Sequence, residues 1–215
     1  ATPTEVSKAI KTIENCTPNV RSKPYAWAKN IAAAHSYNAV PFIFTVAPKG
    51  KTKLDGTEKS NDTLVVSHID IVVTERCSMK CRDCANLMQF YHKPKNIDIN
   101  LLFKSMDRLM DCVDHLYEFR VLGGDPFMNK EMYKVINKAV EYINVESIVI
   151  YTNAKIIPRG ENLECLKNKK VILDISDYGL LDGKKKKVEE VIKICEDNNI
   201  AYTRDVITIW QDCGR

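Results

Sequence analysis

The sequence predicts an α/β fold, a partial (β/α) barrel preceded by a small, mainly helical N-terminal extension. From about residue 64 onward, short apolar runs rich in β-branched residues alternate with longer segments whose apolar residues recur at helical spacing. Strands and helices that alternate in this way form parallel sheets with right-handed crossover connections. Polar or glycine-rich segments follow the first four strands, and the functional residues of α/β barrels gather at these carboxyl ends.

The same patterns give the order of the elements. Strands are expected at residues 65–73, 116–122, 147–151, 171–175 and 201–209. Helices are expected at residues 98–113, from 129 to about 143, at 161–167 and at 184–198. The inward-facing residues of the second helix are expected to be Met132, Val135, Ile136, Ala139, Val140 and Ile143. Because only five core strands can be counted, we expect the barrel to be open.

The region before the core divides into two parts. Residues 1–46 predict a helical extension, with Thr4 as the N-cap of its first helix. Its last segment, 39–46, is apolar and fits a strand at a sheet edge, where Pro41 is tolerated. Residues 47–63 are rich in turn-forming and polar residues and predict a linker. The core domain is therefore expected to span residues 64–215.

The composition of the chain indicates which binding partners and which cellular compartment to expect. Apolar residues make up 45% of the chain and charged residues 28%, as in ordinary soluble globular proteins. The net charge of +4 is small and mixed in sign, which does not favour a nucleic-acid partner. No apolar stretch approaches the roughly 18 residues of a membrane span. Eight cysteines without a secretory signal favour a reducing compartment, so we expect a cytoplasmic protein.

Three cysteines come directly after the first predicted strand. Cys77, Cys81 and Cys84 stand in the segment Cys-Ser-Met-Lys-Cys-Arg-Asp-Cys. Three thiolates on one short loop can converge on a single inorganic centre, and cysteine is the ligand that iron–sulfur clusters use, normally four times. With three local ligands, either a distant residue completes the site or one iron is left open. An open iron is a binding site.

Other uses of these cysteines stay open at this level. A zinc site needs a second local pair of cysteines or histidines, and the cysteines that follow are scattered singly, at Cys112, Cys165, Cys195 and Cys213. A thioredoxin-like redox pair would leave Cys77 unexplained. A structural disulfide fits poorly with an intracellular chain. An iron–sulfur electron-transfer protein or a structural metal-binding protein would use the same three cysteines without further chemistry.

The spacing Cys77-x-x-x-Cys81-x-x-Cys84 after a strand resembles the signature of the radical S-adenosylmethionine (SAM) enzymes. The ends of the next two strands match the same family, in Gly123-Gly124-Asp125-Pro126 and Thr152-Asn153-Ala154. After the fourth strand, in Ser176-Asp177-Tyr178-Gly179, Ser176 and Asp177 lie where similar proteins contact the ribose. The resemblance covers about residues 65–210. It implies a radical SAM-type partial barrel that binds one [4Fe–4S] cluster and SAM. It also implies reductive cleavage of SAM to a 5′-deoxyadenosyl radical, which abstracts hydrogen from a substrate.

The resemblance also implies a role for each matching residue. The cluster ligands would be Cys77, Cys81 and Cys84. The cofactor-binding residues would be Gly123, Gly124, Asp125, Asn153, Ser176, Asp177 and Arg204. Of these, the glycines would admit the methionine amine of SAM, and Asp125 would accept a hydrogen bond from it. Ser176 and Asp177 would contact the ribose, and Arg204 the carboxylate.

Two residues depart from the family pattern. The family usually has glutamate where this chain has Asp125, one methylene shorter, and an aromatic or apolar residue where it has Asp83. The expected partners are a sugar, peptide or small-metabolite substrate and an electron donor such as flavodoxin or ferredoxin. Some members carry a C-terminal extension of the SPASM type that holds auxiliary clusters, to which Cys213 would belong.

Overall fold

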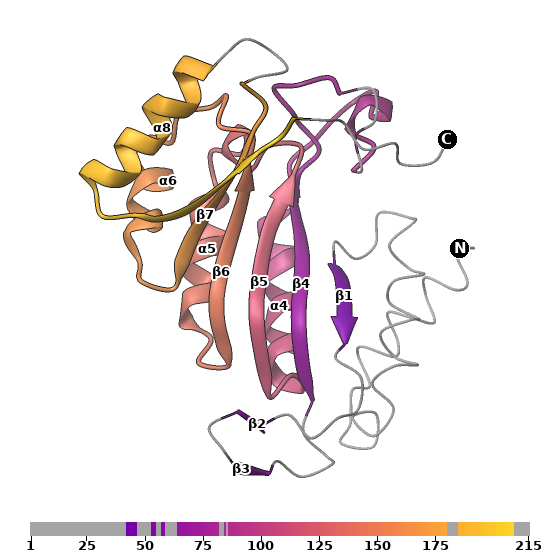
Figure 1. Cartoon of the computed structure of the whole chain (residues 1–215). Coiled ribbons are helices and arrows are strands. Elements are labelled where there is room, and N and C mark those ends of the chain that lie inside the picture. Colours follow the sequence, from indigo (N-terminus) through magenta and orange to yellow (C-terminus); the bar gives the residue numbers. More distant parts are fainter. Residues whose placement is uncertain are drawn as a thin grey trace.

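The structure of the protein is a computed structural model that describes residues 42–46, 53–54, 57–58, 64–81, 84, 86–179 and 185–208 (Figure 1). The helices predicted within the first 38 residues, Asp83 and Cys213 lie outside the described residues.

The strands are β1 (Phe42–Val46), β2 (Lys53–Leu54), β3 (Thr57–Glu58), β4 (Val65–Thr74), β5 (His115–Gly123), β6 (Val145–Thr152), β7 (Val171–Asp177) and β8 (Ala201–Val206). The α-helices are α4 (Ile99–Cys112), α5 (Met132–Glu141), α6 (Glu161–Glu164) and α8 (Lys185–Asp197). Short 3₁₀ turns are η2 (Met88–Phe90), η3 (Pro126–Met128) and η4 (Cys165–Lys167).

One mixed sheet organises the described chain, with the strand order β1-β4-β5-β6-β7-β8. The five strands predicted for the core, β4 to β8, are all parallel, which confirms the expected partial barrel. The apolar run before the linker forms the edge strand β1, which pairs antiparallel with β4 and places Phe44 opposite Ile69. Within the segment predicted as a linker, β2 and β3 pair as a small separate ladder.

The helices lie on one side of this sheet, as Figure 1 shows for α4, α5, α6 and α8. Because side chains alternate along a strand, every second residue of β4 to β7 packs against these helices. The core includes Phe119, Ile148 and Leu173, all fully buried. Helix α4 begins where the Asp98 carboxylate accepts hydrogen bonds from the amides of Asn100 and Leu101.

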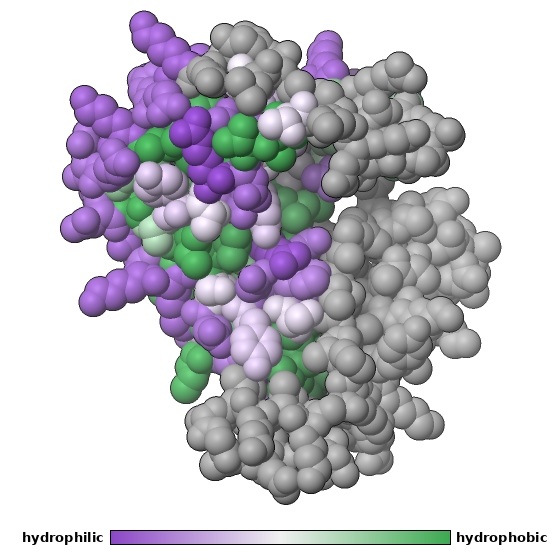
Figure 2. Space-filling view, in the orientation of Figure 1, coloured by the Kyte–Doolittle hydropathy of each residue, from purple (hydrophilic) through white to green (hydrophobic). Residues whose placement is uncertain are grey.

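The other side of the sheet, here called the open face, carries polar side chains between β4 and β8. Its residues include Asp70, Glu118, Arg120, Tyr151 and Asp174, all partly exposed. The Arg120 guanidinium binds the Glu118 carboxylate at 2.6 Å and lies 5.9 Å from the centre of the Tyr151 ring. Figure 2, seen from this side, shows hydrophilic and hydrophobic residues interspersed. The open face therefore carries charged and polar side chains among apolar ones.

The observed elements differ from the predicted ones in three details. The second core helix was expected from residue 129, but η3 precedes it and α5 begins at Met132. Ile143 was expected to face inward; that prediction is wrong, because α5 ends at Glu141 and Ile143 is 95% exposed. Strand β8 ends at Val206 rather than at 209. Within the described part, no helix is both long and apolar enough to cross a membrane.

Candidate cluster and cofactor site

The three cysteines lie in the segment 75–95, whose described residues (75–81, 84 and 86–95) leave the carboxyl end of β4 and return to it. We call this segment the cysteine loop. Its two ends are joined by backbone hydrogen bonds, from Glu75 N to Lys95 O at 2.9 Å and from Ile97 N to Val73 O at 3.2 Å. The ends are thus fixed to the sheet, and the position of the loop follows from the position of β4.

Burial and neighbouring charges act on the thiols of Cys77 and Cys81. Cys77, Cys81 and Cys84 are free thiols and partly exposed. Burial raises the pKa of Cys81 to about 11, and the charges of Cys77 and Cys84 add to this rise. Burial likewise raises the pKa of Cys77, with added effects of Asp125 and Cys84. Cys77 directly follows Arg76, whose carbonyl accepts a hydrogen bond from Asp125 N just after the end of β5.

These thiols fit an iron–sulfur cluster by their chemistry and their position. Among the described residues, no three His, Cys, Asp or Glu side chains are grouped as ligands of a single metal ion. In a [4Fe–4S] cluster, however, each cysteine binds a different iron, so the sulfurs need not meet at one point. Three free thiols on one partly exposed loop supply the donors that such a cluster requires.

The glycine pair at the end of β5 packs against the backbone that leads into the cysteine loop. Gly124 N donates to Thr74 O, and Asp125 N donates to Arg76 O, both at 2.9 Å. A Cβ atom on Gly123 would lie 2.3 Å from the Thr74 carbonyl oxygen, and one on Gly124 would lie 2.1 Å from that of Arg76. Only glycine allows the two backbones to approach so closely. The pair therefore fixes the residues that lead into Cys77.

Three asparagines, for which no role was predicted from the sequence, also hold the cysteine loop in place. Asn86, two residues after Cys84, donates through Nδ2 to the Gly123 carbonyl at 2.9 Å. Asn96 accepts from the Thr74 hydroxyl at 2.8 Å and donates to Asn129 at 3.3 Å. Asn129, which is 1% exposed, donates to the Val73 carbonyl at 3.0 Å. Both ends of the cysteine loop are therefore held by amide side chains.

Asp125 joins the end of β5 to the end of β6. It is fully buried, and its two carboxylate oxygens accept hydrogen bonds from Phe127 N at 3.1 Å, the Thr152 hydroxyl at 2.9 Å and Asn153 N at 3.2 Å. Burial raises the pKa of Asp125, and these hydrogen bonds oppose the rise. About four acceptor positions exist on a carboxylate, so most of its capacity is used within the protein.

Asn153 connects β6 to the first cysteine. Its Nδ2 lies 3.7 Å from the Cys77 sulfur, within range of an N–H···S hydrogen bond. Its Oδ1 accepts from the Ser78 hydroxyl at 3.3 Å and from Lys155 N at 3.0 Å. The residue predicted to face SAM thus contacts the cysteine loop directly.

The end of β7 brings a tyrosine to the cysteines. Burial raises the pKa of Tyr178, the charge of Cys81 adds to the rise, and a hydrogen bond with the Ser176 side chain opposes it. Ser176 is partly exposed and alternates with the buried residues Ile175 and Asp177, so it belongs to the open face. Ser176 and Tyr178 therefore lie on the cysteine side of β7. No role was predicted for Tyr178, although it directly follows a strand end.

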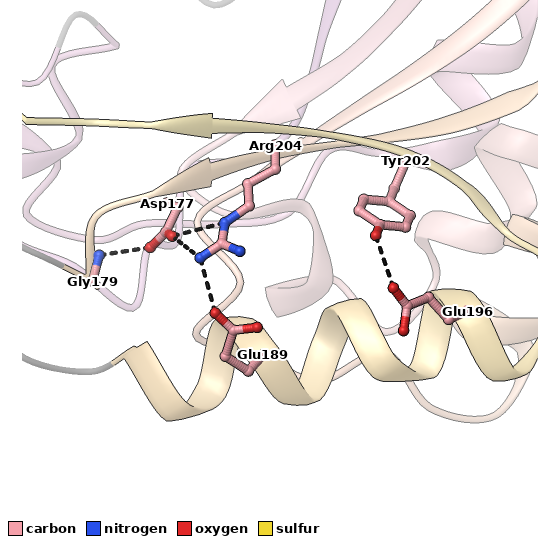
Figure 3. A network of polar contacts seen from close by, with 6 residues as sticks. All are labelled: Asp177, Gly179, Glu189, Glu196, Tyr202 and Arg204. Carbon is pink, nitrogen blue, oxygen red and sulfur yellow. Dashed lines mark hydrogen bonds and ion pairs between the residues drawn. The ribbon is translucent and has the colours of Figure 1, made fainter.

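Asp177 and Arg204 are paired with each other, as Figure 3 shows. The Asp177 carboxylate accepts from Arg204 Nε at 3.0 Å, from Arg204 Nη2 at 2.7 Å and from Gly179 N at 2.8 Å. Arg204 Nη2 also binds the Glu189 carboxylate of α8 at 2.9 Å. The structure thus gathers most of the predicted residues around the cysteine loop, but it directs Asp177 and Arg204 toward α8.

Replacing Arg204 with leucine should lower the free energy of unfolding by about 1–2 kcal/mol at neutral pH, since the buried Asp177 carboxylate loses its charged partner while Arg204 itself is partly exposed. Burial alone would raise the pKa of Asp177, but the hydrogen bonds from Arg204 and Gly179 lower it overall. The stabilisation is therefore complete above the ordinary carboxyl pKa and is lost as pH falls through the lowered one.

Urea unfolding at several pH values tests this expectation. Glu189→Gln is the matched control, because it removes only the exposed partner and should change stability by less than about 0.5 kcal/mol. A difference between Arg204→Leu and the parent protein that stays constant into acid would contradict the proposed ion pair.

The parallel sheet, the three-cysteine loop at its first core strand and the glycine pair on which that loop rests define a radical SAM-type iron–sulfur domain. The family model described as "4Fe-4S single cluster domain" matches residues 67–196, and the chain belongs to this family. It is a radical SAM enzyme domain.

Known proteins similar to the chain include several bacterial GTP 3′,8-cyclases. That of Staphylococcus carnosus is 30% identical over 105 residues, which cover 46% of this chain and 30% of the relative. That of Helicobacter pylori is 22% identical over 145 residues, or 60% of this chain and 44% of the relative. The chain thus spans only about 30% of the length of the Staphylococcus carnosus relative. Streptococcus suis SuiB, solved with bound S-adenosylmethionine, aligns with a TM-score of 0.45 and 15% identity over 69% of this chain and 44% of its own.

Proposed function

We propose that the chain holds a [4Fe–4S] cluster through Cys77, Cys81 and Cys84, binds SAM beside it, and cleaves SAM reductively to begin a radical reaction on a substrate. The observation that carries this proposal is the support of the cysteine loop by Gly123 and Gly124, which places three free thiols next to the strand ends that resemble SAM-binding motifs. When bound, the cluster supplies the electron for cleavage of a carbon–sulfur bond in SAM.

The residues around the cysteines have distinct parts in this proposal. Gly123, Gly124 and Asn153 hold the loop in position, through the contacts described above. Asp125 has one acceptor position left for the SAM amine after its three hydrogen bonds within the protein. The Ser176 hydroxyl borders the open face and is suited to contact SAM directly.

Asp177 and Arg204 act indirectly in this proposal. Their ion pair fixes the end of β7 against α8, and β7 carries Ser176 and Tyr178 to the cysteine side. We therefore propose that they position this strand end rather than contact the ribose and carboxylate of SAM.

We infer that the substrate is a small molecule or peptide that lies on the open face. Among the described residues, the alternation of side chains along the strands puts the carboxylates of Asp70, Glu118, Asp174 and Asp205 on this face, together with the guanidinium of Arg120. Asp174 and Asp205 lie on the neighbouring strands β7 and β8, where Asp174 pairs with Thr203 and Ser176 pairs with Asp205. Burial raises the pKa of Asp174, and the Asp205 charge adds to the rise. This balance of charge favours a neutral or cationic substrate and opposes a triphosphate such as the GTP named for the relatives.

Anaerobic incubation of the reconstituted protein with SAM and dithionite tests the proposed function. We expect 5′-deoxyadenosine to form, measured by liquid chromatography, because reductive cleavage releases the adenosyl group. If a cluster assembles but neither SAM binding nor 5′-deoxyadenosine is detected, the protein is instead an iron–sulfur electron-transfer or structural protein.

Replacing Asn153 with alanine should make the cluster harder to reduce, because hydrogen bonds to the ligand sulfurs help to set the reduction potential. A tenfold change in the ratio of reduced to oxidised cluster corresponds to about 59 mV for a one-electron couple, and we expect a shift of up to this size. EPR-monitored redox titration measures it. Ser78→Ala, which removes only the hydroxyl bonded to Asn153, is the control. An unchanged potential at full iron content would refute the role of the N–H···S contact.

A further inference from the structure

The cysteine loop carries an apolar surface next to its third cysteine. Leu87, Phe90 and Tyr91, here called the loop patch, are 54%, 57% and 41% exposed. Phe90 belongs to the turn η2, which Leu87 and Tyr91 flank and which the buried Met88 anchors. Leu87 N donates to Cys84 O at 3.0 Å, and Phe90 N donates to Leu87 O at 3.0 Å. The patch is therefore tied through the backbone to a predicted cluster ligand.

The conformation of Leu87 sets the loop patch apart from ordinary surface residues. Its φ of +55° lies in the left-handed region, which costs a branched L-residue roughly 1–2 kcal/mol. The chain thus holds an apolar side chain in a strained conformation and leaves more than half of it exposed to water. Grouped exposed apolar side chains on a protein surface mark interaction sites.

The cysteine loop, which carries the loop patch, is rich in basic residues. Residues 75–95 hold five Lys or Arg and two Asp or Glu, so this short segment accounts for most of the net charge of +4. Arg76, Lys80, Lys93 and Lys95 are exposed. The Glu75 carboxylate is engaged by Lys95 N at 3.0 Å. Lys93 and Lys95, here called the basic rim, follow Tyr91 closely in the sequence and are exposed. Exposed apolar side chains with lysines next to them are complementary to a protein that presents acidic groups around an apolar contact.

We propose that the loop patch and its basic rim form the docking surface for an acidic one-electron carrier protein of the flavodoxin or ferredoxin type. The inference rests on the proposed function, which requires one electron to reach the cluster. The docked carrier loses one electron and the cluster gains it, and no covalent bond of this chain forms or breaks. The apolar side chains supply affinity, and the lysines steer the carrier toward the cysteine loop, which contains Cys84.

Binding of reduced flavodoxin to the reconstituted full chain tests the proposal. Phe90→Ala and the double variant Lys93→Glu/Lys95→Glu should each weaken binding about tenfold or more in isothermal titration at low salt. Leu101→Ala and Lys169→Glu/Lys193→Glu are the controls, because Leu101 is 62% exposed on α4 and both lysines are exposed away from the loop. The controls should bind as the parent protein does, and binding by the parent should weaken with added salt.

Stopped-flow reduction separates this inference from the proposed function. Flavodoxin should reduce the cluster more slowly in the patch variants, whereas dithionite, which needs no docking surface, should reduce all variants equally and support 5′-deoxyadenosine formation. If the patch variants bind flavodoxin like the parent protein, or if the controls lose binding equally, the docking surface is wrong. A dimer in sedimentation velocity that Phe90→Ala abolishes would also overturn it, because the patch would then join two copies of the chain.

Discussion

Gly124→Ala should cost the protein its iron–sulfur cluster and lower its free energy of unfolding by about 3 kcal/mol, the largest effect we expect from adding a single methyl group. The new Cβ would lie 2.1 Å from Arg76 O and 2.7 Å from Cys77 N, and both are backbone atoms that no side-chain rotation can move away. The ends of β4 and β5 would have to separate. The hydrogen bonds of Gly124 N and Asp125 N would then be lost, and Cys77 would be displaced.

Gly160→Ala is the matched control for this substitution. Its φ is +57°, so alanine is strained there as well, but a Cβ would have no other atom within 4 Å. We expect a loss of about 1 kcal/mol and a normal iron content. Urea unfolding and iron analysis after anaerobic reconstitution measure both effects. Equal iron content in the two variants would show that the close approach at Gly124 does not position the cysteines.

Cys81→Ala should abolish cluster binding altogether. The chain supplies three local thiolates, and with two of them an iron–sulfur cluster lacks half of its usual four ligands. We expect the visible absorption and the acid-labile sulfide of the reconstituted protein to disappear, together with formation of 5′-deoxyadenosine. The fold should persist, because Cys81 is partly exposed and outside the sheet.

Cys195→Ala controls for the loss of a thiol. Cys195 is 1% exposed on the inner side of α8, so its removal leaves a small cavity that costs about 1 kcal/mol without touching the cysteine loop. Iron and sulfide should remain at the level of the parent protein. A cluster that survives in Cys81→Ala at full iron content would mean that Cys81 is not a ligand.

The sequence was sufficient to predict the sheet and its helices because their signals are local. The apolar periodicity of β4 to β8, and the helices between them, follow from short windows of residues. Ile143 continues the apolar stripe of α5 but is exposed, because the chain leaves the helix at Glu141 to reach β6. The stripe alone does not show where a helix ends.

Much of the candidate site could be located from the sequence, but its contacts could not. Strand ends meet at one edge of a parallel sheet, and this placed the cysteines, the glycine pair and Asn153 together. The pairing of Asp177 with Arg204 joins residues 27 positions apart on neighbouring strands and depends on side-chain direction. The support by Asn86, Asn96 and Asn129 likewise depends on tertiary contacts, for which asparagine carries no distinctive pattern.

The central claim is that the cysteine loop holds a cluster with one iron open to SAM. EPR spectroscopy of the reduced, anaerobically reconstituted protein tests it most directly, with and without SAM. We predict the signal of a reduced [4Fe–4S] cluster in the protein alone and a changed signal once SAM is added, because SAM would bind the open iron. A cluster signal that SAM leaves unaltered, or metal analysis that finds zinc in place of iron and sulfide, would contradict the claim.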